Sequence, residues 1–91
     1  MNEKLKTPRE LFTPNFINDC NNAELGSSII NSAASNKPNN LNWGILQTFK
    51  NDSIGGGLPT DIQILTYCDN NNNTYTKTRS KIGNNSYSEW K

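Results

Sequence analysis

The chain has 91 residues, enough for one small domain and too few for two domains with separate cores. Lysine and arginine number 9 against 8 aspartates and glutamates, so the net charge of +1 excludes a nucleic-acid or anionic-membrane binder that works through a basic surface. Histidine is absent, which removes the commonest general base and the commonest metal ligand, and the hydrophobic share of 32% predicts a thin core.

The first predicted elements are helical. A capping box at residues 7–10, with Thr, Pro and Glu in order, predicts a short turn near 8–12. A second Thr-Pro pair at 13–14 precedes apolar residues at helical spacing, which predicts a short helix over about 14–22. Gly26 follows closely and fits as a stop or turn residue.

After this helix the apolar residues recur with a period of two. Strands are predicted over 28–31, 43–49, 61–68 and 74–80, and residues 87–90 are predicted to close the chain as an edge strand. The element order predicts an α+β fold, with a short N-terminal helix followed by a small antiparallel meander around a thin core.

Two connections resemble ligand-binding loops and lack the residues that such loops need. The run 69–73 matches the opening of an EF-hand, but Thr74 stands where the loop needs Gly and Ser80 where it needs Glu. The glycines at 55–57 lack the Lys-Ser/Thr ending of a phosphate loop, so residues 50–59 are predicted to form a mobile loop. We predict no metal site.

No catalytic arrangement is recognisable. The carboxylates form no recognisable pair, and no histidine supports a nucleophilic Ser or Cys, so we predict no enzyme activity, no catalytic residue and no cofactor. Cys20 and Cys68 could pair across their 48-residue separation, but two free, partly buried thiols are the expected state.

The chain carries no signal for export or membrane insertion. The N-terminus lacks the apolar core of a signal peptide, and no apolar run reaches the roughly 18 residues of a membrane span. We therefore expect no export by a signal sequence and no membrane insertion. The sequons at Asn51, Asn72 and Asn84 are expected to be chance products of the 17 asparagines.

Aromatic residues are the remaining candidates for recognition. Flat aromatic faces with nearby Asn and Asp side chains suit sugar rings. Packing offers a second interpretation: Trp43 heads an apolar strand and is expected in the core, while Tyr67 and Tyr75 are expected to form a cross-strand pair. Trp90 either fastens the last strand to the sheet or lies at a subunit contact.

One pattern runs from about residue 15 to residue 91. Its parts are the short helix near Asn18-Asp19, Gly26, Asn36-x-Pro38, Trp43-Gly44-Ile45-Leu46, Ile62-Gln63-Ile64-Leu65-Thr66-Tyr67, Tyr75-Thr76-Lys77-Thr78-Arg79, Gly83 and Tyr87-Ser88-Glu89-Trp90-Lys91. With this pattern the chain resembles the knob domains of R-type pyocin and phage tail fibres. The resemblance implies an N-terminal segment or linker over 1–14 and a knob-like domain over 15–91.

The resemblance also implies a function. It implies a non-enzymatic, homotrimeric fibre or spike module of a virion, made in the host cytoplasm, that spaces a fibre or contributes to attachment to a bacterial surface, with cell-surface glycan as a ligand. Tyr75, Lys77 and Arg79 share one strand face and, with Trp90, are the candidate surface contacts. A solvated strand face explains Lys77 and Arg79 equally well.

A second class of function remains open. A small phage-encoded intracellular protein that binds and modulates a host protein would also have a thin core and no catalytic residues. The solution mass separates the two, since a fibre module is expected to be a trimer and an inhibitor a monomer or dimer.

Overall fold

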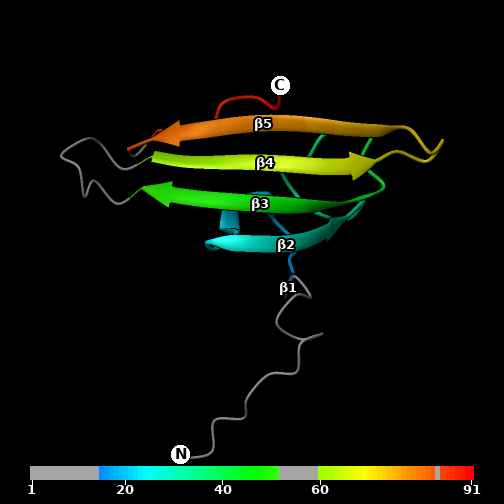
Figure 1. The fold of residues 1–91 in the computed structure, drawn as a ribbon, viewed down its shortest axis with the longest axis horizontal. Helices are drawn as coiled ribbons and strands as arrows, with labels where there is room; N and C mark the ends of the chain where they lie inside the picture. Colours follow the sequence, from blue (N-terminus) through cyan, green and yellow to red (C-terminus); the bar gives the residue numbers. More distant parts are fainter. Residues whose placement is uncertain (1–14, 52–59, 84) are drawn as a thin grey trace, which may run out of the picture.

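A computed structural model of the chain describes residues 15–51, 60–83 and 85–91. It forms one five-stranded mixed sheet in the order β1-β2-β3-β4-β5 (Figure 1). β1 runs parallel to β2, and every other neighbouring pair is antiparallel. The strands are β1 (Asn15–Phe16), β2 (Gly26–Asn31), β3 (Trp43–Asn51), β4 (Thr60–Cys68) and β5 (Thr74–Ile82).

The N-terminal helix predicted over 14–22 is wrong, and the fold is mostly β rather than α+β. Its residues form β1 and a three-residue 3-10 helix, η1 (Cys20–Asn22), and the described residues contain no helix of seven or more residues. The Asp19 side chain accepts a hydrogen bond from the Asn21 amide and caps this single turn. Asp and Asn bond readily to nearby backbone, which favours turns over continued helix. The turn predicted near 8–12 lies outside the described residues.

The antiparallel meander is confirmed for β2 to β5. β3, β4 and β5 pair over nine residues each, because β-branched and aromatic residues alternate along them. The predicted turn at 69–73 is also confirmed, and Asn72 takes a positive φ of 66° there, a conformation that Asn tolerates better than most residues. Most of the loop predicted over 50–59 lies outside the described residues.

The edge strand predicted over 87–90 is wrong, since this segment forms no regular strand. The segment does lie along the edge of β5 (Figure 1): the Ser88 amide donates to the Ser80 carbonyl at 2.8 Å and the Lys91 amide to the Thr78 carbonyl at 2.9 Å. A regular ladder is interrupted because the Trp90 side chain packs back against the core.

The two faces of the sheet differ in cover. Residues 17–25 and 32–42 lie across one face, the covered face (Figure 1), where the core is built, and the segment 85–91 along the edge of β5 adds Tyr87 and Trp90 to it. The opposite face, the open face, has no second layer among the described segments. The described part of the chain includes no helix of the length and apolarity that crossing a bilayer requires. The buried hydrophobic residues of the core are Cys20, Ala23, Ile30, Ala34, Leu41, Leu46, Leu65 and Tyr67.

Candidate functional site: the open face of the sheet

The open face exposes large hydrophobic side chains. Successive side chains of a strand point to opposite faces, so the residues of β3 that flank Leu46 and Thr48 face outward. Five large side chains on the open face are between 38% and 50% exposed: Trp43, Ile45, Phe49, Ile62 and Ile82. Ile29 and Ile64 lie between them and are half-buried. The open face therefore exposes several large apolar side chains that the described fold leaves in solvent.

The open face carries no charged side chain from the described strands. Asp61 on β4 lies opposite Lys50 on β3 and Lys81 on β5, and both lysines form ion pairs with its Oδ2 atom, at 3.9 and 3.7 Å. By the alternation along each strand, these residues lie on the covered face, together with Lys77 and Arg79. The polar members of the open face are neutral: Ser27, Asn31, Gln47, Asn51, Thr60, Thr66, Thr74, Thr76, Thr78 and Ser80.

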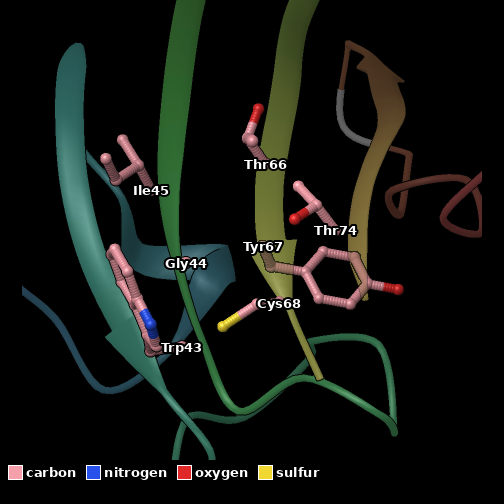
Figure 2. A pocket seen from close by; sticks show the side chains of 7 residues that line it. All are labelled: Trp43, Gly44, Ile45, Thr66, Tyr67, Cys68 and Thr74. Carbon is pink, nitrogen blue, oxygen red and sulfur yellow. The ribbon is translucent and has the colours of Figure 1, made fainter. Parts of the chain in front are cut away.

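A hollow of about 170 Å³ lies at one end of the open face. Figure 2 shows Trp43 and Ile45 from β3 beside Thr66 and Cys68 from β4, with Thr74 of β5 at the far side. Gly44 and Tyr67, which are partners in the β3–β4 register, complete the lining. The lining is mostly apolar, so the hollow is suited to a hydrophobic group rather than to an ion.

Gly44 is required for the close approach of β3 and β4 at the hollow. A Cβ atom on Gly44 would lie 2.6 Å from the Tyr67 Cβ and 2.8 Å from the Thr66 carbonyl oxygen. Both distances are too short for any side chain, and one of the two neighbours is backbone. Glycine therefore stands at a register position of β3 where the sheet leaves no room for a Cβ.

Arg79, predicted as a surface contact, is buried with 7% exposure on the covered face. Its Nε donates to the Gln63 Oε1 at 2.7 Å and its Nη2 to the Asn21 Oδ1 at 2.8 Å. The rings of Tyr87 and Trp90 lie against the guanidinium, with their centres 4.0 and 4.5 Å from its central carbon. Burial lowers the pKa of the Arg79 guanidinium from its ordinary value. Arg79 thus holds the covering segments together. It does not protrude into solvent, as a surface contact would have to.

The other three predicted contacts are only partly exposed. Tyr75 and Lys77 share one strand face with Arg79, as the sequence predicted, but this is the covered face. Tyr75 stacks on Tyr67 with ring centres 5.0 Å apart, which confirms the cross-strand pair. Trp90 packs against the core and donates its indole N–H to the Asn36 carbonyl at 2.9 Å. The structure therefore brings Arg79 and Trp90 together as a packing contact.

Three titratable groups of the described residues, Cys20, Cys68 and Asp69, lie in the core, in the hollow and in a turn. Cys20 and Cys68 are free, which confirms the expected thiols; Cys20 is buried, and burial raises the pKa of its thiol to about 11. Asp69 accepts four hydrogen bonds in its turn, from Asn71, from the backbone and side chain of Asn73, and from Tyr75. The described residues contain no group of three or more His, Cys, Asp or Glu side chains that could hold a metal.

Sequence reasoning missed the open face because it placed Trp43 in the core. Alternation assigned Trp43, Ile45 and Phe49 to one face correctly, but Trp43 is 50% exposed. The covered side of β3 carries the smaller residues Gly44 and Thr48 beside Leu46. Residue size therefore indicated the opposite side of β3 as the core side, which was wrong.

Comparison with known proteins gives no relative: no protein-family model, curated protein or solved structure matches the chain. The function is therefore inferred from the geometry of the site and from the sequence pattern. Two features of the geometry bear on it, the uncharged open face and the hollow beside Trp43. Neither feature brings together a nucleophile and a base, and both suit contact with another molecule.

Proposed function

We propose that this chain is a non-enzymatic binding module that docks a protein partner on its open face, within a fibre or spike of a virion. One observation carries the proposal, the uncharged face on which Trp43, Ile45 and Phe49 are exposed. Monomers rarely expose apolar patches of more than a few hundred Å², and larger ones mark sites of interaction. The whole face, its neutral polar residues included, measures about 30 by 19 Å, roughly 500 Å² because β2 is shorter than the other strands.

The chemistry of the open face suits docking. Taking a large side chain from full exposure to full burial contributes about 1.5–3 kcal/mol, so burial of the half-exposed Trp43, Phe49 and Ile62 contributes about half of that for each. Threonine and serine hydroxyls on β5 can supply hydrogen bonds at one side of this surface. Without charge on the face, recognition depends on shape and apolar burial rather than on electrostatic steering.

The sequence resemblance supports the setting of this docking. A module of a fibre must join neighbouring chains, and the open face offers a surface for that contact. Attachment to a bacterial surface, with glycan as the ligand, would then belong to the assembled fibre. A host protein bound on the same face is the alternative partner, as a small intracellular modulator would require.

Site-specific crosslinking tests the proposal. The full chain is produced in a bacterial host with a photoreactive residue at Ile45 on the open face, and in parallel at Glu89, which is exposed on the C-terminal segment. We expect protein adducts from position 45 well above those from position 89. Adducts with the chain itself or with virion proteins support the fibre setting, and adducts with a host protein support the alternative. Equal or absent adducts at the two positions would overturn docking on the open face.

A further inference from the structure

We infer that the partner covering the open face is another copy of this chain, packed with sheet face against sheet face. This inference rests on the proposed function and names the occupant of the same surface. It draws on three properties of the described strands: the size of the face, its lack of charge, and the positions of Trp43 and of the hollow beside Cys68.

The size of the open face is of the order that a stable interface between copies needs. Its flat area of about 500 Å², counted without side-chain relief, compares with the roughly 800 Å² of accessible surface that each partner contributes to a standard interface. Two sheets that stack face to face lie about 10 Å apart with their side chains interdigitated. The half-exposed Phe49 and Ile62, which are register partners, project far enough to fill half of that space.

The open face is also chemically compatible with itself. When one surface patch meets its own copy across a two-fold axis, any charge close to the axis meets a like charge. The described strands place no charge on the open face, because Lys50, Asp61 and Lys81 alternate to the other side. A partner of opposite charge would have nothing to recognise here, whereas a second copy meets only neutral and apolar groups.

The register offers one way for the copies to fit. A two-fold axis along the strands, between β3 and β4, sets β3 of one copy over β4 of the other. Because Trp43 pairs with Cys68 within the sheet, this rotation places Trp43 of one copy opposite Cys68 of the other, beside the hollow. Phe49 comes to lie opposite Ile62 by the same operation. Both contacts bury aromatic side chains, the residues that dominate interface energetics.

The test uses the purified full chain and two readouts. Light scattering at 1–100 µM gives the mass, with twice 10.2 kDa expected for the face-to-face pair. The rate at which a maleimide labels the half-buried Cys68 is measured at the same concentrations, and it is expected to fall as the copies cover the open face. Cys20 is fully buried, so Cys68 is the thiol that reports.

Two lysine variants separate this interface from any other. Ile45→Lys places like charges in the paired faces and is expected to weaken association at least about 100-fold. Asn39→Lys adds the same charge at an exposed position on a segment across the covered face, and it is expected to associate as the original chain does. Circular dichroism checks that both variants fold, and Phe49→Ser replaces Ile45→Lys if that variant does not.

Each outcome has a defined meaning. The inference is supported if Ile45→Lys loses self-association while Asn39→Lys keeps it, and if the rate of Cys68 labelling in Ile45→Lys no longer depends on protein concentration. A monomer across the whole range overturns it, and so does an oligomer that Ile45→Lys leaves intact. A monomer that still forms crosslinks with other proteins through position 45 leaves the proposed function standing. A monomer without such crosslinks removes both.

Discussion

The guanidinium carbon of Arg79 lies 4.0 Å from the centre of the Tyr87 ring, in a position almost closed to solvent. The same side chain contacts Trp90 and donates to Asn21, a residue 58 positions away in the chain. Arg79 therefore joins the first covering segment to the last one across the covered face. Through Gln63, whose Nε2 donates to the Cys20 carbonyl at 2.8 Å, the network continues into the core.

Arg79→Lys is expected to lower the free energy of unfolding by roughly 2 kcal/mol, because a buried charged donor loses its paired geometry. The charge is kept, so the loss reports the hydrogen bonds to Gln63 and Asn21 and the contacts with the rings. Urea unfolding followed by circular dichroism measures the change. Lys91→Ala, at an exposed side chain, is the control and should stay within about 0.5 kcal/mol of the original. An Arg79→Lys chain as stable as this control would contradict the prediction.

Gly44→Ala is expected to destabilise the sheet by roughly 2–3 kcal/mol, because the added methyl overlaps Tyr67 and the Thr66 carbonyl. Gly83 provides the matched control: it has a φ of +60° and no atom within 4 Å of an added Cβ. Gly83→Asn should therefore have little effect, since Asn tolerates this conformation. Thermal unfolding of both variants distinguishes the loss of stability caused by steric overlap from the loss caused by backbone conformation. Equal losses of stability in the two variants would show that overlap of the added methyl group at Gly44 does not cause the destabilisation.

The strands were predictable from sequence because their signal is local. Alternation along 61–68 and 74–80 fixed both the strand type and the residues that share a face, and the intervening turn followed from its Asp and Asn residues. The helix predicted over 14–22 was wrong because that prediction also used only a local signal. Its cap signal was local, while the outcome depends on pairing of Phe16 with Ile29 and of Asp19 with Ser35, which lie farther along the chain.

The open face was not predictable, because the choice of covered face is made by long-range contacts. The Cys20 carbonyl meets Gln63 across 43 residues, and Trp90 meets Asn36 across 54. Neither contact leaves a pattern in a single strand. A local interpretation sends charged residues such as Arg79 to solvent and Trp43 to the core, and the structure reverses both.

The two thiols are expected to react at very different rates. Cys20 is fully buried and burial raises its thiol pKa to about 11, so little reactive thiolate forms at pH 8. Cys68 lines the hollow on the open face and is only half-buried. At low protein concentration, Ellman's reagent should titrate one thiol rapidly and the second only after unfolding. Cys68→Ser should remove the fast phase, and a fast phase that persists in this variant would contradict the structure.

Asp69 is expected to make the stability of the fold depend on acid. Hydrogen bonds from Asn73, from the Asn71 amide and from the Tyr75 hydroxyl hold the pKa of the Asp69 carboxyl at about 2, below its ordinary value of 3.8. Because the folded state binds this proton more weakly than the unfolded state, the contribution to stability is fully present above about pH 4. It is lost as the pH falls from about 4 to 2.

Carbon-detected nuclear magnetic resonance of the Asp69 carboxyl gives its pKa directly. Tyr75→Phe removes the hydroxyl that donates to the Asp69 Oδ2 at 2.9 Å, so the pKa of Asp69 should rise toward its ordinary value. Asp69→Asn should reduce the acid dependence of urea unfolding between pH 4 and 2, and the remainder includes Asp19, whose pKa is also lowered by the hydrogen bond from Asn36. An Asp69 carboxyl that titrates near 3.8 in the original chain would show that the turn does not hold it as described.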